Sequence, residues 1–141
     1  MLSAAAIIIG IITFYIKLNK DSEVAAYRET IAYMDRHADV LREQWELIQA
    51  SDADQKVIKL FLNRLEQMAL LVNKKAFDNE LVYSSYWELY CKPLEQKCVE
   101  DFFVTSRIRD QHIYSEYKKL SESWRQRIQE EQSGDTLSTV P

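Results

Sequence analysis

The sequence predicts an all-α protein with an N-terminal transmembrane helix followed by an up-and-down bundle of about four helices. The chain has 141 residues but only two Gly and two Pro, too few to supply the turns of a β-sandwich or a phosphate-binding loop. Residues 1–16 contain no charged side chain, and apolar residues recur at helical spacing in the remainder. We expect an anchor at residues 1–20 and the bundle at 21–129. Residues 130–141 have little to bury and predict a disordered tail.

The first predicted element is the membrane anchor. Residues 1–16 (MLSAAAIIIGIITFYI) would form a helix roughly 24 Å long, and Leu18 with snorkelling Lys17 and Lys20 reduces the difference from a hydrocarbon core of about 30 Å. A cleaved signal peptide would need basic residues before the apolar run and a small-residue cleavage site after it, and neither is present. A buried or interfacial helix is the remaining alternative.

Basic residues near the span predict its orientation. Lys17, Lys20 and Arg28 all follow the apolar run, and Lys and Arg flanking a span favour the cytoplasmic side. We therefore expect a single-pass protein of the inner or plasma membrane, with its N-terminus outside and its body in the cytoplasm. Cys91 and Cys98 are expected to be reduced there.

The next predicted helix begins at Asp21 or Ser22, both typical capping residues. Its apolar residues recur in alternating steps of three and four, as in a coiled coil, and form a row that we call the heptad seam. Such a row packs either on other helices of the same chain or on a second copy of the protein. The heptad seam consists of Val24, Tyr27, Ile31, Met34, Ala38, Leu41, Trp45 and Ile48.

Capping residues also predict the following two helices. Residues 50–55 carry no large apolar side chain and predict a turn, with Asp52 or Asp54 opening a helix that runs to about Asn73. Asp78 is expected to open the third helix.

The last part of the bundle is predicted from a proline and a resumed apolar pattern. Pro93 lacks an N–H and clashes with the preceding turn, so we expect a break near Cys91. The pattern then continues to Thr105 and Ser106, which are expected to cap a final helix. The apolar stripe of this final helix comprises Ile113, Tyr117, Leu120, Trp124 and Ile128.

A short motif in the second bundle helix carries a resemblance. The stretch LFLNRLEQMALLVNKKAFDNELV contains Leu62-Asn63-x-x-Glu66-x-x-Ala69, and Tyr114-x-x-Tyr117-x-x-Leu120-x-x-x-Trp124 follows further along. The chain resembles a bacterial and phage family of small, membrane-anchored helical proteins of unknown function. The resemblance implies the fold and an N-terminal span, and it implies no activity.

Asn63 and Glu66 form a candidate structural polar motif, because residues three apart share one face of a helix. Glu66 falls at the edge of the apolar stripe. One interpretation is a buried carboxylate that orients a partner or binds a basic group. The interpretation that we favour is a boundary residue in a structural hydrogen bond or ion pair.

Composition and motifs favour no catalytic, cofactor or metal site. A net charge of −4 argues against nucleic-acid binding driven by counterion release. Cys91 and Cys98 are seven apart and both histidines are distant in sequence, unlike the spacing of zinc ligands. No metalloprotease, serine-hydrolase or EF-hand motif occurs.

These observations predict a membrane-anchored interaction or regulatory module without catalytic activity, as in a prophage or defence accessory protein, that binds itself or another protein. One alternative is a membrane-tethered enzyme with a site around Glu66, His112 and Cys98, and another is a structural subunit of a larger membrane complex. Aromatic and heptad side chains are candidate interface residues, because aromatic residues anchor interfaces. They are Tyr27, Met34, Leu41, Trp45, Tyr83, Tyr86, Trp87 and Tyr90.

Overall fold

The computed structural model describes residues 3–107 and 112–138. These residues form five α-helices and no strand, which confirms the all-α prediction and agrees with a helical bundle. The helices are α1 (Ala4–Gln49), α2 (Gln55–Asn73), α3 (Asn79–Cys91), α4 (Lys97–Arg107) and α5 (Ser115–Ser138), with a short 3-10 helix, η1 (Pro93–Glu95), between α3 and α4.

Helix α1 is one continuous helix of 46 residues. The prediction that a new helix begins at Asp21 or Ser22 is wrong, because no Gly or Pro lies between Lys17 and Ser22 to interrupt the backbone hydrogen bonds. The helix begins instead after Ser3, whose Oγ accepts a hydrogen bond from the Ala6 N–H at 3.3 Å.

The predicted transmembrane helix is not found. Within residues 3–107 and 112–138, no helix is both long enough and apolar enough to cross a membrane. The uncharged part of α1 ends at Lys17, with Lys20 and Asp21 one turn later. From Ala4 to Ile16 the helix rises only about 20 Å, against a hydrocarbon core of about 30 Å.

Two aspartates and a proline set the ends of α2 and α3 as predicted. Asp54 accepts from the Val57 N–H at 2.8 Å and Asp78 accepts from the Leu81 N–H at 2.9 Å, so each caps the helix that follows it. Helix α3 ends at Cys91, and Pro93 opens η1.

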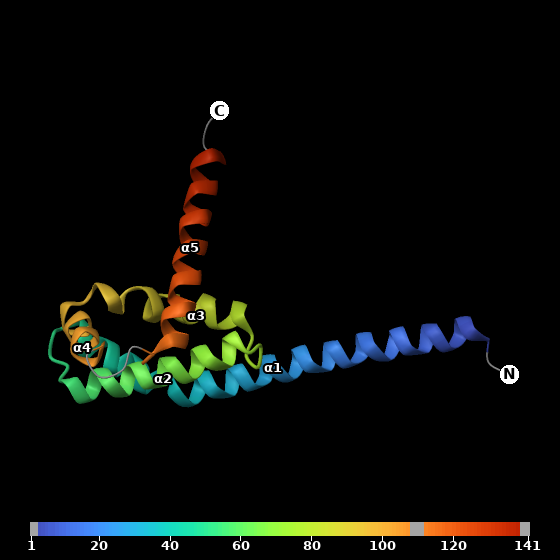
Figure 1. Cartoon of the computed structure of the whole chain (residues 1–141), viewed down its shortest axis with the longest axis horizontal. Coiled ribbons are helices and arrows are strands. Elements are labelled where there is room, and N and C mark those ends of the chain that lie inside the picture. The colour runs from blue at the N-terminus through green and yellow to red at the C-terminus, as the bar shows by residue number, and fades with distance from the viewer. Residues whose placement is uncertain (1–2, 108–111, 139–141) are drawn as a thin grey trace.

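Helix α2 is the centre of the core and packs against α1, α3, α4 and α5. Helices α1, α2 and α3 alternate in direction, whereas α5 rises steeply away from them (Figure 1). The predicted up-and-down arrangement therefore describes the first three helices only. The side chains of α2 that are buried are Ile58, Phe61, Leu62, Leu65, Met68, Ala69 and Val72.

Two predictions about the C-terminal region are wrong. Thr105 and Ser106 lie within α4 and do not cap the final helix, since α4 continues to Arg107 and the Thr105 hydroxyl donates to the Asp101 carbonyl of its own helix. The predicted disordered tail at 130–141 continues α5 as a helix to Ser138, and the Arg127–Glu131 ion pair lies at its start. Residues 139–141 lie outside the described part of the chain.

Candidate functional site

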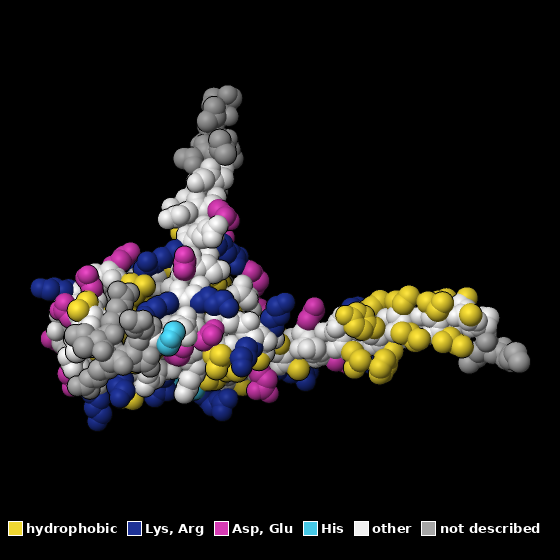
Figure 2. Space-filling view, viewed as in Figure 1, with side chains coloured by type: hydrophobic (Ala, Val, Ile, Leu, Met, Phe, Trp, Pro, Cys, Tyr) yellow, Lys and Arg dark blue, Asp and Glu magenta, His cyan; other side chains and the backbone are white. Residues whose placement is uncertain are grey.

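Among the described residues, a long run of exposed apolar side chains lies at the N-terminal end of α1, residues 4–18, which we call the apolar tip. This part of α1 extends beyond the rest of the molecule (Figure 1), and apolar side chains cover the face of it seen in Figure 2. Ile9 and Phe14 are 64% and 65% exposed. The other large apolar side chains exposed there are Ile7, Ile8, Ile11, Ile12, Tyr15, Ile16 and Leu18. Soluble monomers rarely expose a contiguous apolar surface of this extent, so the apolar tip is a candidate binding surface.

The heptad seam divides into two parts along α1. Leu41 and Ile48 are buried against the bundle, and Trp45 stacks on Phe61 of α2 with ring centroids 6.1 Å apart. Toward the apolar tip, by contrast, Val24, Tyr27 and Ile31 are exposed, and Met34 is half-buried at the boundary. The predicted interface residues of α1 are thus partly core and partly surface.

The predicted interface residues of α3 face three different surroundings. Tyr86 and Trp87 are half-buried and line a shallow groove with Leu41 and Trp45 of α1, of about 310 Å³. Tyr83 instead packs edge-on against Trp124 of α5. Only the first two therefore belong to a surface shared with α1.

Tyr90 is a core residue. It is fully buried, and its hydroxyl donates to the Leu65 carbonyl at 2.7 Å. Burial, the largest cause, and the neighbouring Tyr117 raise its pKa well above the ordinary value. Tyr90 is therefore not accessible to a partner.

The motif residues Asn63 and Glu66 hold the start of α5. The Glu66 carboxylate accepts from the backbone N–H groups of Glu116 and Tyr117, at 3.2 and 2.6 Å. Asn63 Oδ1 accepts from the Tyr114 hydroxyl at 2.9 Å, and Tyr114 itself has a φ of 58°. Because the first N–H groups of a helix have no intrahelical acceptor, a carboxylate from α2 supplies one and fixes α5 to the core.

Two of the three side chains of the enzyme alternative, Glu66 and Cys98, make separate structural contacts. Glu66 is engaged by the two α5 amides, Cys98 Sγ donates to the Ile48 carbonyl at 3.9 Å, and His112 is exposed. Burial raises the pKa of the Cys91 thiol. In the described part of the chain, no group of three or more His, Cys, Asp or Glu side chains could hold a metal ion.

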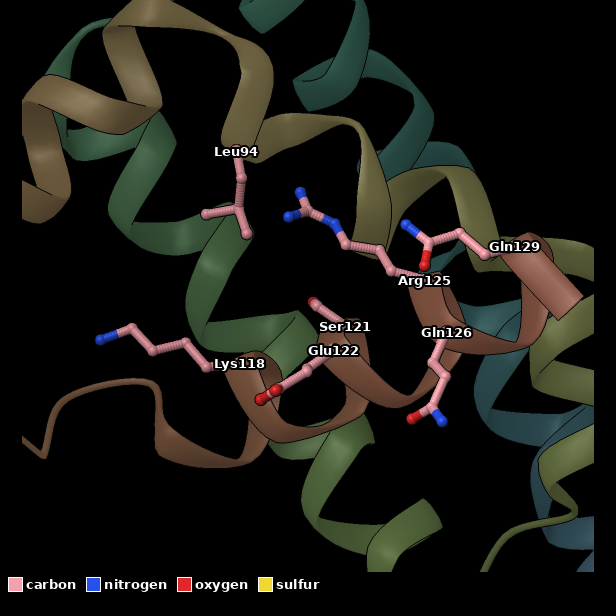
Figure 3. A pocket seen from close by; sticks show the side chains of 7 residues that line it. All are labelled: Leu94, Lys118, Ser121, Glu122, Arg125, Gln126 and Gln129. Carbon is pink, nitrogen blue, oxygen red and sulfur yellow. The ribbon is translucent and has the colours of Figure 1, made fainter.

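An open groove of about 450 Å³ runs beside α5 and is lined by residues of α5 and by Leu94 (Figure 3). Two of its polar side chains already hold the fold together. Arg125 donates to the Cys91 carbonyl at 2.7 Å, and Ser121 donates to the Tyr90 carbonyl at 2.8 Å. These bonds fix α5 to the end of α3, so the groove offers no converging set of reactive groups.

A family comparison gives the chain its place among known proteins. The model of a domain of unknown function, DUF4760, matches residues 1–124. The chain belongs to this family. No curated protein and no solved structure matches it. The DUF4760 match extends from the apolar tip to Trp124, so it includes the Asn63 and Glu66 motif and the part of α5 that this motif holds.

Two polar features of this DUF4760 chain were missed in the sequence. The fully buried Thr30 hydroxyl donates to the Ala26 carbonyl at 2.6 Å and accepts from the Asp78 N–H at 2.8 Å, which joins α1 to the start of α3. An Arg64 N–H group also lies 2.8 Å from His37 Nδ1, across the α1–α2 contact. Neither contact can be predicted from neighbouring residues, because its two partners lie far apart in the sequence.

Burial, followed by the charges of Arg64 and Arg36, lowers the pKa of His37. The ring of Tyr33 lies 4.2 Å from that of His37, centroid to centroid. This contact shields the imidazole from water and favours its neutral form.

Proposed function

We propose that this protein is a membrane-anchored helical module that acts by binding another protein. One observation carries the proposal: the exposed apolar tip and the packed core belong to the same uninterrupted helix, α1. Insertion of the tip into a bilayer would hold the bundle beside the membrane.

The energetics of apolar burial support a bilayer as the environment of the tip. Removing a side chain such as Ile or Phe from water is favourable by about 1.5 to 3 kcal/mol. The tip carries several exposed side chains of this kind, and the hydroxyls of Thr13 within it and of Ser3 just before it are satisfied by the helix backbone. A bilayer accommodates apolar side chains on every face of a helix, whereas a protein groove covers one face.

Basic residues at the end of the tip support an orientation of the proposed anchor. Lys17, Lys20 and Arg28 lie on the side of the bundle, and the positive-inside rule assigns that side to the cytoplasm. We propose location at the inner or plasma membrane, with the bundle cytoplasmic and the tip directed outward. Snorkelling of Lys17 and Lys20 and local thinning of the bilayer would make up the difference between the tip and the hydrocarbon core.

A binding role is supported by the exposed seam of α1 and the α1–α3 groove. Confinement to a membrane raises the effective concentration of a protein toward other membrane proteins, so small surfaces become sufficient for binding. A prophage or host-defence accessory role in bacteria is the setting that we propose for such a module.

Flotation of the full chain with phospholipid vesicles tests the anchor. We expect the native chain to float and the Ile9→Asp/Ile12→Asp variant to remain in the dense fraction, because each charge would have to enter the apolar layer. Leu60→Asp/Leu70→Asp is the matched control, since it alters two exposed apolar residues of α2 in the same way. Equal flotation of the two variants would contradict the anchor.

Thiol labelling in intact cells tests the orientation. Ser133→Cys on α5 and Ser3→Cys beside the tip are compared on a background that lacks Cys91 and Cys98. We expect an impermeant reagent to label position 3 in intact cells and position 133 only after lysis. Labelling of position 133 before lysis would place the bundle outside. Protection of position 3 would mean that the tip enters the bilayer without crossing it.

A further inference from the structure

The exposed part of the heptad seam is a helix face without a partner in its own chain. Val24, Tyr27 and Ile31 continue the spacing of Leu41 and Ile48, yet nothing in the described residues buries them. The sequence specifies a packing face here, and the fold of one chain leaves it open.

Near residues 24–31, the rest of the bundle contacts a side of α1 other than the exposed seam. Thr30 is fully buried and bonds to the start of α3, whereas Ile31, about 100° further around the helix, is exposed. Ala26 and Glu23 share a groove with Phe77 of the bundle. A second helix can therefore lie along the seam without displacing the bundle.

We propose that the occupant of this face is a second copy of the chain, with the two α1 helices parallel and in register. In heptad notation, the exposed β-branched residues Val24 and Ile31 occupy a positions, and Tyr27 occupies the d position between them. β-Branched residues at a, combined with Leu at d, favour two-stranded parallel coiled coils, and Val24 and Ile31 supply the a part of that pattern.

Charge complementarity supports the same arrangement. Glu23 occupies a g position and Arg28 the e position of the next heptad, and a parallel pair places these side chains opposite each other across the interface. The twofold symmetry produces this attraction on both sides of the seam. On one helix the two residues lie about 140° apart and cannot meet. In the described part of the chain, neither forms an ion pair.

The parallel orientation rests on the proposed membrane anchor. Two tips inserted in one bilayer point the same way, while an antiparallel pair would direct them oppositely. Lys17 and Lys20 occupy the next a and d positions toward the tip and end the seam there. The contact is short, so it depends on the effective concentration that a shared membrane supplies.

Disulfide crosslinking of the full chain in vesicles tests the register. Tyr27→Cys is compared with Glu29→Cys, which lies at the f position on the far side of the helix, both on a background that lacks Cys91 and Cys98. We expect crosslinked dimer at position 27 to exceed that at position 29 by at least about tenfold. Equal crosslinking at the two positions would overturn the proposal.

Charge reversal tests the pairing between copies, with crosslinking at position 27 as the readout. Glu23→Arg and Arg28→Glu are each expected to reduce the crosslinked dimer several-fold, and the double variant to restore it. Failure of the double variant to restore crosslinking would exclude the parallel register. Flotation of the same samples distinguishes failure of the dimer from failure of the anchor. Chains that float but do not crosslink retain the anchor and lack the dimer. Chains that do not float contradict the anchor itself.

Discussion

Helix α1 carries the same heptad seam in opposite surroundings, exposed N-terminal to Met34 (the exposed half) and packed C-terminal to it (the packed half). In the packed half, Leu41 and Ile48 are 1% and 0% exposed. In the exposed half, Ile31 is 38% exposed and Val24 is 50% exposed. A heptad pattern therefore specifies a helix face that needs a packing partner. The rest of the fold decides whether other helices of the same chain supply it.

The largest expected effect comes from truncating equivalent seam residues in the two halves. Leu41→Ala should lower the free energy of unfolding of the monomer by about 2 to 5 kcal/mol, because it leaves a cavity in the core. Ile31→Ala should change it by less than about 0.5 kcal/mol. Urea denaturation of the dilute detergent-solubilised chain measures both. Equal losses of unfolding free energy in the two variants would show that the two halves are equally packed.

The junction between the halves can be broken at a single hydroxyl. Thr30→Val keeps the shape of the side chain but leaves the half-buried Asp78 N–H without its acceptor, at an expected cost of about 1 to 3 kcal/mol. Thr13→Val is the matched control, since the Thr13 hydroxyl bonds only to the Ile9 carbonyl of its own helix and is exposed. The same denaturation experiment should find the control unchanged. A similar loss of unfolding free energy in both variants would mean that the Thr30–Asp78 hydrogen bond does not specifically stabilise the fold.

A change of pH should act on the packed half through His37. The fold lowers the pKa of this imidazole from its ordinary value of 6.5, so below that pH the unfolded chain binds more protons than the folded one. Stability should therefore fall as the pH is lowered from about 7.5 to 5.5. The decrease in Tm should be smaller in His37→Gln, which cannot be protonated. Identical pH profiles would exclude His37 as the source.

The smallest effect on the bundle is expected from a break in the exposed half. Asp21→Pro removes a backbone donor and clashes with the Lys17 carbonyl, so the helix should be interrupted there. Amide exchange of residues 4–20 should accelerate, while the unfolding free energy of the bundle changes by less than about 0.5 kcal/mol. Asp21→Ala should leave exchange unchanged. Destabilisation of the bundle by the proline would show that the two halves fold as one unit.

The sequence predicts those features that depend on neighbouring residues. Asp54 and Asp78 cap helices because each side chain reaches an N–H three residues later. Pro93 ends α3 for an equally local reason. The position of Glu66 at the edge of the apolar stripe of α2 can likewise be predicted, because it follows from helical spacing alone.

The features that the sequence does not predict depend on contacts between distant segments. The division of the heptad seam depends on where α2 and α3 happen to end, and the Thr30 junction joins residues 48 apart. The continuity of α1 was missed because Asp21 and Ser22 resemble a cap, although nothing before them interrupts the helix. The role of Glu66 at α5 required knowing that residues 116 and 117 lie beside it.

The unbroken course of α1 makes its exposed half a spacer of fixed length. From Lys17 to Glu29 the helix rises about 20 Å before Thr30 joins it to the bundle. With the apolar tip in a bilayer, an upright α1 would hold the core at that height above the lipid headgroups, and a tilted α1 would hold it closer. On the proposed anchor, a partner of the α1–α3 groove would have to reach the same height from the membrane, which would favour proteins with a domain beside the membrane over those confined to the lipid surface.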